Sequence, residues 1–447
     1  MSDQIVRGPL LKTVTLGCKV NQYETEYVRQ GLHRAGYVDA QPQESAQLCI
    51  VNTCTVTAEG DAKSRQVIRR MARENPASRI VVMGCYATRA PAEVAALPGV
   101  AEVITDKREL PDLLGRFGVI DVPTGISSFS GRRRAYVKIQ DGCMLRCSYC
   151  IIPMVRPLLT SRPLPEIVDE VDRLVAAGYR EIILTGIHLG HYGVDWNRSK
   201  PKDQWIRLAH VVDHLALRDG EYRLRLSSIE ATEVTRELIA VLASHRDRVA
   251  PHLHLCLQSG SDRILRRMRR RWGVRMFLDR CRMLREALPE PALSTDVIVG
   301  FPGESEADFE ATLETCRAAG FAKIHAFPFS PRRGTAAAQM PDPVPPEVIA
   351  ARVQRLLELD EQLRSEYCQT LIGKELTIIV DAQRGRDESE SARFARPDEE
   401  GWYHLEGISC RSLPVVARTP AIPDLKQLIR VRIDHSAGDR LTGTAIA

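Results

Sequence analysis

The sequence has no apolar run long enough to span a membrane, and its first residues, Met-Ser-Asp-Gln-Ile-Val-Arg-Gly-Pro, contain no apolar signal core. It also lacks a large charge excess, because 62 Lys and Arg face 57 Asp and Glu and the net charge is only +5. Such a chain permits nucleic-acid binding but does not require it. Twelve cysteines would suit a disulfide scaffold only in a short secreted chain, and this chain has 447 residues. We therefore expect a cytoplasmic protein of two or three domains, whose thiols are metal ligands or ordinary core residues.

The most informative segment is Cys143-Met-Leu-Arg-Cys147-Ser-Tyr-Cys150, which follows a strand-like run, Ala135–Gln140. Three thiolates within eight residues allow one loop to hold three corners of a [4Fe–4S] cube. A structural zinc site would need a fourth Cys or His nearby, and none follows Cys150. Chance clustering of three buried thiols is the alternative. The spacing favours a cluster with one iron left open for another ligand.

Strand-like runs alternate with helical segments over the first hundred or so residues: Thr13–Leu16, Leu48–Val51 and Ile80–Met83. This alternation predicts a parallel, doubly wound sheet, whose functional crevice lies at the carboxyl ends of the strands. Cys18, Cys54 and Cys85 each follow the end of a different one of these strands. The topology therefore predicts a second group of three thiolates at one edge of the sheet.

Beyond a Pro-, Gly-, Ser- and Arg-containing stretch at about Gly118–Arg134, six further strand-like runs alternate with helical segments: Ala135–Gln140, Glu181–Gly186, Tyr222–Ser227, His252–Gln258, Leu293–Val299 and Phe321–Phe327. Six such units predict a partial (β/α)6 barrel with its active face at the C-terminal ends of the strands. Pro345–Gln369 reads as a closing helix. Short strand-like runs then predict a small β-barrel: Glu375–Val380, Trp402–Ile408, Ser412–Val416 and Leu428–Ile433.

The predicted central strands end in residues able to touch a cofactor. Glycines in Leu184-Thr-Gly-Ile-His-Leu-Gly190 allow close backbone approach to a charged ligand. Ser227-Ser-Ile-Glu230 offers hydroxyls and a carboxylate suited to ribose or ammonium contacts. Leu257–Asp262 adds a polar run, and Asp296–Glu304 adds a turn flanked by glycines. One such turn is a weak indication, but several on one predicted face favour a pocket.

The sequence resembles the methylthiotransferases of the radical S-adenosylmethionine (SAM) superfamily over almost its whole length. Three segments resemble the N-terminal domain of that family: Thr15-Leu-Gly-Cys-Lys-Val-Asn-Gln-Tyr-Glu-Thr-Glu26, Val51-Asn-Thr-Cys-Thr-Val-Thr57 and Val82-Met-Gly-Cys85. Five resemble its radical SAM domain: Cys150-Ile-Ile-Pro153, Leu184-Thr-Gly186, Leu226-Ser-Ser-Ile-Glu230, His252–Asp262 and Thr295–Glu304. The C-terminal part is loosely similar to its small RNA-binding TRAM barrel. The resemblance implies an N-terminal domain over residues 8–117, a linker over 118–134, a radical SAM domain over 135–370 and a TRAM-like domain over 371–447.

The resemblance also implies two [4Fe–4S] clusters. Cys143, Cys147 and Cys150 would hold the cluster that binds SAM and cleaves it to methionine and a 5′-deoxyadenosyl radical. A second, auxiliary cluster would carry the sulfur that is methylated by another SAM and inserted at C2 of an adenine. Its ligands would be Cys18, Cys54 and Cys85.

By the same resemblance, Tyr149 takes the aromatic position beside the SAM adenine. The candidates for further SAM contacts are Gly186, Ser228, Glu230, Gln258 and Ser259. No acid–base pair stands out, and we predict no catalytic residue beyond the cluster ligands.

Within the family, Leu16–Glu26 is most similar to enzymes acting on N6-threonylcarbamoyladenosine in tRNA. The branch acting on isopentenyladenosine usually reads Gly-Cys-Gln-Met-Asn here, and the branch modifying a ribosomal-protein aspartate reads Gly-Cys-Pro-Lys-Asn. The resemblance therefore predicts 2-methylthio formation on the threonylcarbamoyl nucleoside next to the anticodon, at position 37. The other two branches are alternatives. A non-catalytic iron–sulfur regulatory or electron-transfer protein is the alternative from another class, although it would not need a SAM-type pocket.

The implied partners are tRNA and a low-potential reductant such as flavodoxin or ferredoxin, with the protein acting as a monomer and the sulfur donor unidentified. A base in a tRNA loop must be exposed before its C2 edge can be reached. Binding the backbone needs cationic surface, and the densest basic run is Arg263–Trp272. Its candidate RNA contacts are Arg263, Arg266, Arg267 and Arg270. A solvated helix face is the alternative, with Ile264, Leu265 and Met268 on its apolar side.

The other six cysteines are expected to pack as small apolar residues: Cys49, Cys256, Cys281, Cys316, Cys368 and Cys410. His188 and His191 are three residues apart, but we interpret them as polar surface residues rather than zinc ligands. Two features depart from the family pattern. Arg156 is followed by Pro157 where relatives usually have Gly, and an acidic, Arg-containing insert, Arg384–Glu400, interrupts the C-terminal barrel and is expected to be flexible.

Overall fold

The structure is a computed structural model that describes residues 8–129, 133–380, 397–421, 424 and 427–446. The chain divides into two units by its internal contacts. Unit 1 contains the chain up to Ser127 together with Asp141–Leu159 and Ser330–Ala338. Unit 2 contains Ser128–Gln140, Thr160–Phe329 and Gln339–Ala447. Among the described residues, no helix is both long and apolar enough to cross a membrane.

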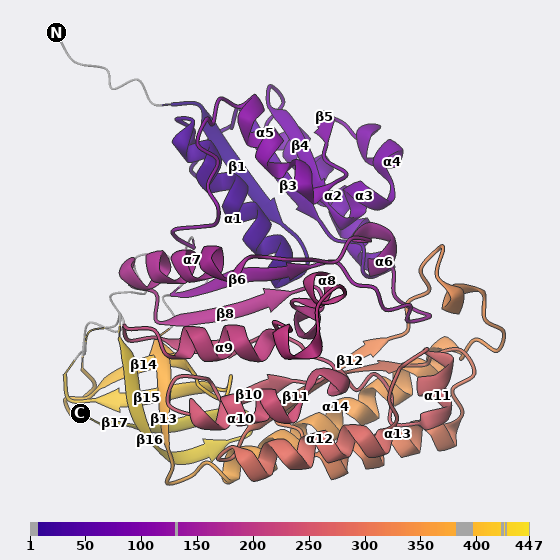
Figure 1. Cartoon of the computed structure of the whole chain (residues 1–447), viewed down its shortest axis with the longest axis vertical. Helices are drawn as coiled ribbons and strands as arrows, with labels where there is room; N and C mark the ends of the chain where they lie inside the picture. The colour runs from indigo at the N-terminus through magenta and orange to yellow at the C-terminus, as the bar shows by residue number, and fades with distance from the viewer. Residues whose placement is uncertain (1–7, 130–132, 381–396, 422–423, 425–426, 447) are drawn as a thin grey trace. The chain divides into compact units, whose positions relative to one another are not determined.

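Unit 1 is built on a parallel sheet of five strands in the order β2-β1-β3-β4-β5 (Figure 1). Its strands are β1 (Leu10–Thr15), β2 (Val38–Asp39), β3 (Leu48–Thr53), β4 (Arg79–Gly84) and β5 (Val100–Val103). The strand order reverses at β1, so a topological switch point lies between β1 and β3. The register places Asn52 of β3 opposite both Thr15 of β1 and Met83 of β4, so these three strands end level with one another.

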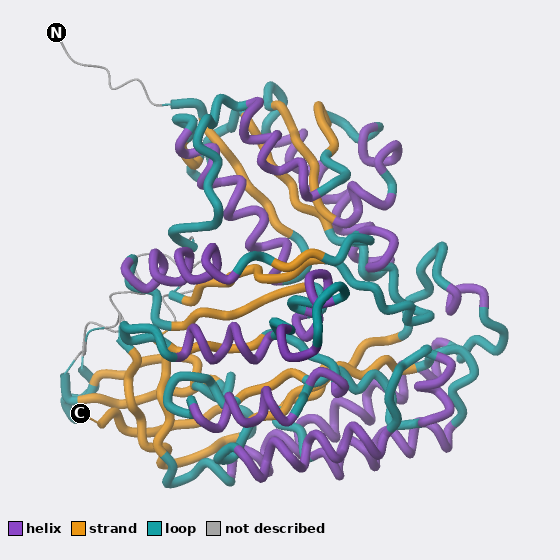
Figure 2. Tube along the Cα trace, viewed as in Figure 1, coloured by secondary structure: helices purple, strands orange, loops and turns teal. Residues whose placement is uncertain are grey.

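Alternating residues of the strands of unit 1 face two helical layers (Figure 2). On one face, Ile50 packs with apolar residues of α1 (Lys19–Arg34) and α5 (Leu110–Arg116). On the other face, Cys49 and Val51 pack against helical residues that include Ile68 and Tyr86. The helices of this second layer are α2 (Ala58–Glu74), α3 (Cys85–Arg89) and α4 (Pro91–Ala95). This arrangement confirms the predicted doubly wound fold.

The central part of unit 2 contains the six predicted parallel strands in two sheets, with β6, β8 and β9 in one and β10, β11 and β12 in the other. Their bounds are β6 (Arg134–Asp141), β8 (Glu181–Gly186), β9 (Arg223–Leu226), β10 (His252–His254), β11 (Ala292–Val299) and β12 (Lys323–Pro328). The short strand β7 (Thr160–Ser161) lies beside β6. Isolated parallel bridges, Leu224 to Val249 and Ile229 to Leu255, continue the pairing from β9 towards β10. The six strands therefore form the expected partial barrel.

The connecting helices are α7 (Leu164–Ala176), α8 (Val194–Asn197), α9 (Leu208–Ala216), α10 (Arg236–Ser244), α11 (Asp262–Arg267), α12 (Val274–Ala287), α13 (Glu306–Ala319) and α14 (Pro346–Gln369). The last of these, α14, packs against β12, where the buried Asp360 carboxylate accepts the Ile324 N–H at 2.6 Å and pairs with Lys323. The helix predicted to close the central region therefore holds its last strand.

A closed barrel of five strands ends the chain, in the order β13-β14-β15-β17-β16. Its strands are β13 (Glu375–Val380), β14 (Tyr403–Ser409), β15 (Pro414–Thr419), β16 (Leu428–Ala437) and β17 (Arg440–Ile446). The barrel is tied to the beginnings of β8 and β9 through Arg223 and Arg225, which share the buried carboxylate of Glu181. Arg223 also donates to the Thr377 carbonyl at 2.9 Å, and Arg225 to the Ser409 carbonyl at 3.1 Å.

Two details of the secondary structure differ from the sequence-based expectation. The strand predicted to reach Gln258 ends at His254, so Cys256 lies beyond it rather than inside it. The fifth barrel strand, β17, was not predicted. Most of the predicted flexible insert, Arg384–Glu400, falls in residues 381–396, which lie outside the described residues.

Candidate functional site

The three strand-end cysteines of unit 1, Cys18, Cys54 and Cys85, stand where the chain leaves β1, β3 and β4. Cys18 caps the N-terminus of α1, and Cys85 is the first residue of α3. Cys54 follows β3 directly and precedes Thr57, whose hydroxyl caps α2. Because β1, β3 and β4 end level, the three thiols are delivered to one edge of the sheet.

One close backbone approach and the electrostatic interactions among the thiols show that these cysteines lie near one another. Gly17 has φ +94°, and a Cβ added there would stand 3.0 Å from the Cys54 sulfur, so only glycine fits beside that thiol. Cys18 retains exposed surface, but the protein around its sulfur raises its pKa by desolvation, and the neighbouring Cys85 adds repulsion. The pKa of Cys54 is also raised, by desolvation and then by Cys85 and Cys18.

This donor set fits an iron–sulfur cluster. Three desolvated thiols within interaction distance repel one another as thiolates, and a bound metal cluster would remove that penalty by coordinating them. Soft thiolates are the ligands that such clusters require. These residues are therefore suited to hold a cluster.

The second group of thiols lies in the three-cysteine loop, Asp141–Leu159, which belongs to unit 1 although it follows β6 in the chain. Its half-buried thiols are Cys143, Cys147 and Cys150. The loop closes on itself at Gly142, which has φ +74° and where a Cβ would collide with the Leu158 carbonyl. Inside the loop, the Cys150 N–H donates to the Cys147 carbonyl at 3.1 Å. Tyr149, the predicted neighbour of the SAM adenine, is half-buried in the same loop.

The two groups of cysteines are linked inside unit 1. Cys85 packs with Ile151 and Val155. Ile151 directly follows Cys150 and is the N-cap of the short helix α6 (Ile152–Val155), and Val155 is the last residue of that helix. Arg156 ends that helix and points inward, with a side chain only 2% exposed. Its Nε–H donates to the Cys85 sulfur at 3.4 Å. The sequence departure at Arg156–Pro157 therefore leaves the arginine buried against the other cysteine group.

Arg156 is held by two carboxylates. Its guanidinium makes a bidentate pair with Glu24, both contacts at 2.8 Å, and its Nη1 also reaches Asp141 at 2.8 Å. Burial would lower the pKa of Arg156, but the carboxylates of Glu24 and Asp141 raise it well above the usual value. Nearby, burial lowers the pKa of Lys107, whose ammonium donates to Thr88 of α3 at 3.0 Å. Two basic side chains, Arg156 and Lys107, therefore lie on the Cys85 side of the cluster site.

A second buried arginine joins unit 1 from a distant part of the chain. Arg332, in the Ser330–Ala338 segment, pairs with Asp61 at 2.5 Å and donates to the Thr55 hydroxyl at 2.9 Å. Arg89 of α3 binds the same two groups, both at 2.8 Å. The segment also contacts the three-cysteine loop, because the Ala337 N–H donates to the Ser148 carbonyl at 2.8 Å. Sequence reasoning missed Asp61 and Arg332, since no local pattern marks them.

In unit 2, the predicted SAM contacts fall at strand ends but differ in their surroundings. Gly186 ends β8 against Gln140, whose side-chain oxygen accepts the His188 N–H at 2.8 Å. Gln258 has φ +66°, a conformation that costs free energy in a non-glycine residue and is concentrated at functional sites. Ser228 is half-buried two residues beyond β9.

Two of these candidates already have side-chain partners. Ser259 is fully buried, and its hydroxyl accepts the Ser261 N–H at 3.2 Å. The Glu230 carboxylate pairs with Arg270 and accepts the Trp272 indole N–H at 3.2 Å. A SAM contact through either side chain stays a prediction. SAM would then have to share that side chain with the hydrogen-bond partners just described.

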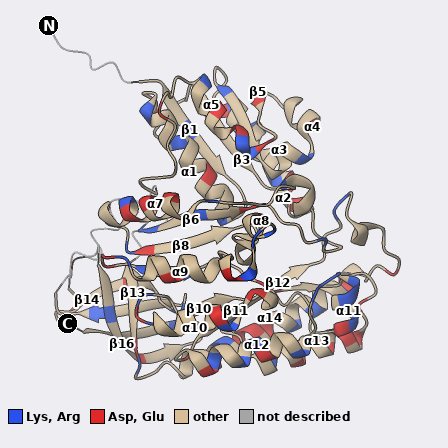
Figure 3. Ribbon diagram, viewed as in Figure 1, with Lys and Arg blue, Asp and Glu red and all other residues tan. Residues whose placement is uncertain are grey.

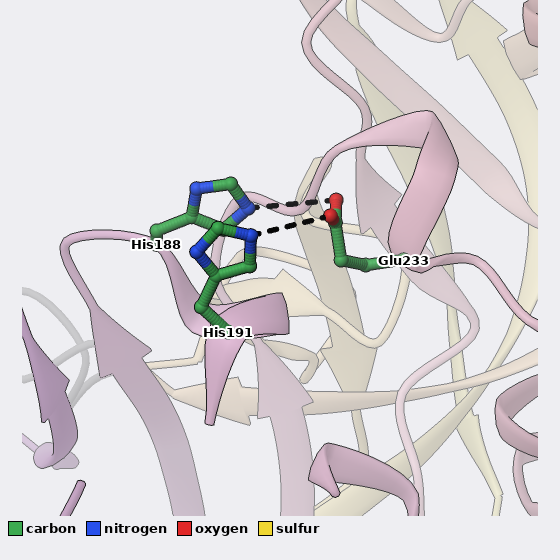
Figure 4. A group of neighbouring side chains, drawn as sticks. All are labelled: His188, His191 and Glu233. Carbon is green, nitrogen blue, oxygen red and sulfur yellow. Dashed lines mark ion pairs between the residues drawn. The ribbon is translucent and has the colours of Figure 1, made fainter. Parts of the chain in front are cut away.

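His188 and His191 are buried, which corrects their interpretation as surface residues. Their rings stack 3.6 Å apart and nearly parallel, at 6°, and both face Glu233 (Figure 4). The Nε2 atoms lie 3.4 and 3.6 Å from the carboxylate oxygens. Ligand-type atoms thus lie within 4.8 Å of one another. However, lone pairs in two parallel ring planes cannot both point at one ion, so a metal would require a ring to rotate.

Arg271 completes this group of unit 2. Its Nη2 lies 3.0 Å from Glu233 and 3.3 Å from His191. Burial first, and then His188, lower the pKa of His191 to about 4, so its ring is neutral near neutral pH. The pKa of Glu233 is lowered by the histidines in spite of burial. Sequence reasoning missed Glu233, although it had singled out the glycine-rich turn that contains His188.

A smaller polar group lies at the end of β10. His254 contacts Asp296 of β11 at 3.2 Å through Nε2 and Ser294 at 3.1 Å through Nδ1. Cys256 is half-buried beside them, unlike the other five cysteines expected to pack as apolar residues, which are buried. Because both nitrogens of His254 are engaged by neighbours, the arrangement orients the imidazole rather than leaving it open.

The basic run has mixed surroundings, and charges of both signs alternate along the neighbouring α12 and α13 (Figure 3). Arg263 pairs with Asp308, Arg267 lies half-buried beside Gly303, and the Arg270 side chain is only 3% exposed. Arg266 is exposed. Ile264, Leu265 and Met268 are buried, as expected for the apolar side of a helix. RNA contact by these arginines stays a prediction, and Arg266 is the best placed for it.

Known proteins resemble this chain in both sequence and fold. Residues 11–106 match the family described as "Uncharacterized protein family UPF0004", and residues 137–316 match the Radical SAM superfamily. A Bacillus subtilis protein named "Threonylcarbamoyladenosine tRNA methylthiotransferase MtaB" is 42% identical, covering 84% of this chain and 86% of its own length. A protein of the same name from Chlamydia pneumoniae is 38% identical, covering 97% and 98%.

A more distant relative carries another name. The "tRNA-2-methylthio-N(6)-dimethylallyladenosine synthase" of Acidothermus cellulolyticus is 33% identical, covering 92% of this chain and 85% of its own length. Among solved structures, the radical S-adenosylmethionine methyltransferase TsrM from Kitasatospora setae, with cobalamin and a [4Fe-4S] cluster bound, has a TM-score of 0.53. It covers 74% of this chain and 77% of its own at 15% identity, so that likeness concerns the fold alone.

Proposed function

The chain belongs to the radical SAM tRNA methylthiotransferase family, and from this premise we propose that it converts N6-threonylcarbamoyladenosine at position 37 of tRNA, next to the anticodon, to its 2-methylthio derivative. The observation that carries the proposal is the presence of two separate groups of three cysteines in unit 1, one at the sheet edge and one in the three-cysteine loop. SAM and two [4Fe–4S] clusters are the cofactors of such an enzyme.

The residues divide between two tasks. Cys143, Cys147 and Cys150 are proposed to hold the SAM-binding cluster, leaving one iron open. The other cluster is proposed to be held by Cys18, Cys54 and Cys85. When bound, the SAM-binding cluster and SAM supply the radical that removes hydrogen from C2, and the auxiliary cluster supplies sulfur. The protein's own contribution is to fix both thiolate groups within one unit, so that neither depends on a flexible linker for its place.

The choice of nucleoside rests on similarity. Two relatives named for threonylcarbamoyladenosine are 42% and 38% identical to this chain, whereas three relatives named for dimethylallyladenosine are 32–34% identical. The Lys19-Val-Asn21 sequence after Cys18 supports the same choice. We propose in addition that the protein acts as a monomer in the cytoplasm with a low-potential reductant such as flavodoxin or ferredoxin, because reductive cleavage of SAM needs an electron.

The test is mass spectrometry of tRNA nucleosides from a strain lacking the gene, with and without the gene restored. We expect the 2-methylthio form of threonylcarbamoyladenosine to disappear and to return on complementation, while the 2-methylthio form of isopentenyladenosine stays unchanged. Loss of the isopentenyl derivative instead would assign the chain to the alternative branch. Unchanged levels of both tRNA derivatives would overturn the proposal and direct attention to a ribosomal protein.

A further inference from the structure

Arg156 contacts three parts of unit 1, namely α1, Cys85 and the three-cysteine loop. Its Nη2 donates to the Asn21 side-chain oxygen at 3.0 Å and to Glu24 at 2.8 Å, both on α1 just beyond Cys18. Its Nε–H donates to the Cys85 sulfur at 3.4 Å. Its Nη1 binds Asp141, and its backbone carbonyl accepts the Cys143 N–H at 3.4 Å, both in the three-cysteine loop. One residue therefore touches both cysteine groups.

The contacts of this guanidinium exceed what an ion pair requires. Glu24 and Asp141 alone already supply two negative charges to one cation. The remaining Nε–H is aimed at a sulfur, which is a weak acceptor as a thiol and a much better one as a thiolate. A donor fixed at this position, in a side chain only 2% exposed, is suited to a metal-bound thiolate.

Hydrogen bonds to the ligand sulfurs are one of the factors that set the reduction potential of an iron–sulfur cluster. An N–H directed at a thiolate withdraws electron density from the sulfur and favours the reduced, more negative cluster. The same bond restrains the side chain of Cys85 and so keeps this ligand in place. Outer-shell partners of this kind typically change metal affinity or activity by about 10–100-fold when they are removed.

We propose that Arg156 is a positioning residue for the auxiliary cluster, which raises its reduction potential through the bond to Cys85 and anchors the three-cysteine loop beside it. This inference rests on the proposed ligation of that cluster by Cys18, Cys54 and Cys85. It differs from a purely structural ion pair, which would affect stability but not the potential of a cluster.

The experiment compares full-length proteins with both clusters loaded and iron content matched to the wild type. The variants are Arg156→Met, which removes charge and donor, and Arg156→Lys, which keeps the charge but places its donor differently. The matched control is Arg29→Met. Arg29 also bridges two carboxylates of unit 1, Glu26 and Asp39, but lies about three helical turns along α1 from Cys18.

The readout is a redox titration followed by electron paramagnetic resonance. When no sulfide is supplied to the auxiliary cluster, added SAM changes only the signal of the cluster whose open iron binds it, so the SAM-insensitive signal reports the auxiliary cluster. We expect its midpoint to shift to a more negative potential in Arg156→Met, by less in Arg156→Lys, and not at all in Arg29→Met. We also expect iron loss to a chelator to be about 10–100-fold faster in Arg156→Met.

Unchanged midpoint and chelation rate in Arg156→Met would overturn the inference. If Arg156→Met does not retain both clusters, Arg156→Lys decides it by the same midpoint criterion. Cys85→Ala separates this outcome from failure of the proposed function. If Cys85→Ala keeps the SAM-insensitive signal, the assigned ligation is wrong, whereas loss of that signal with an unshifted Arg156→Lys midpoint rejects only the role of Arg156.

Discussion

The two thiolate groups of unit 1 are built in opposite ways. The three-cysteine loop places Cys143, Cys147 and Cys150 within eight consecutive residues, so chain proximity does most of the gathering. The strand-end group collects Cys18, Cys54 and Cys85 from three separate strands, and here the level ends of a parallel sheet do the gathering. A local loop depends on its turn geometry, whereas an assembled site depends on the whole sheet. The two sites should therefore respond differently to the same kind of mutation.

The largest expected difference concerns the chemistry that each group supports. Cys147→Ala should abolish SAM cleavage, because the cluster loop loses a ligand and the electron has no route to SAM. Cys54→Ala should leave 5′-deoxyadenosine formation in place but abolish the methylthiolated nucleoside. Liquid chromatography of 5′-deoxyadenosine and mass spectrometry of the tRNA product measure the two steps. Continued 5′-deoxyadenosine formation by Cys147→Ala would contradict the assignment of the loop.

A smaller effect tests the dependence of the loop on its closing turn. Gly142→Ala forces an alanine to φ +74° and against the Leu158 carbonyl, a strain of about 1–3 kcal/mol before the collision is counted. We expect SAM cleavage to fall about 100-fold through misplacement of the loop, with the auxiliary cluster retained. The rate of SAM cleavage and the iron signals of both clusters are the measurements.

The control for this substitution is Gly115→Ala on α5, where an added Cβ meets nothing within 4 Å and φ is not positive. It should stabilise unit 1 by about 0.5–1 kcal/mol, because alanine is the better helix former. A Gly142→Ala protein as active as the Gly115→Ala protein would show that the loop tolerates a displaced turn.

The smallest expected effect concerns the group formed by His188, His191 and Glu233, whose side chains are of metal-ligand type but do not point at one common position. The pKa of His191 is about 4 in the folded protein and higher when unfolded, so the unfolded state binds more protons between these values. Stability should therefore be intact above pH ~6.5 and decline as the pH falls below it. His191→Gln should flatten that part of the profile of Tm against pH, from 7.5 to 5.5. His210→Gln, at an exposed position, is the control, and an equally steep decline in both variants would rule out His191 as the cause.

Sequence reasoning predicted where both groups of cysteines lie because each placement depends on a pattern along the chain, namely a short spacing in one case and strand–helix alternation in the other. Their role as cluster ligands stays a prediction. Sequence reasoning found the bounds of β8 and β13 for the same reason. It could not find the partner of Asp61, because Arg332 lies 271 positions away and nothing local marks either residue. It also missed that His188 and His191 are buried, since their shared partner Glu233 comes from a different strand end.

The placement of the segment Ser330–Ala338 is a second case that could not be predicted from the sequence. By chain order it follows β12 and belongs to the central region, yet its contacts place it in unit 1. Side-chain pairing between distant segments decides this, through Arg332 with Asp61 and through Ala337 with Ser148. Periodicity and motif spacing carry no information about such pairings, so the extent of unit 1 could be learned only from the structure.

Unit 1 is made of three separate segments of the chain, and this affects the design of fragments and chimeras of the protein. A fragment that stops near Ser127 would retain Glu24 and Asp61 but lose Arg156 and Arg332, so Glu24 would lose its bidentate arginine and Asp61 would keep only Arg89. Breaking a buried pair in this way typically costs about 3–5 kcal/mol, comparable to much of the stability of a small domain. A chimera that exchanges the N-terminal region with a relative should therefore carry all three segments of the unit together.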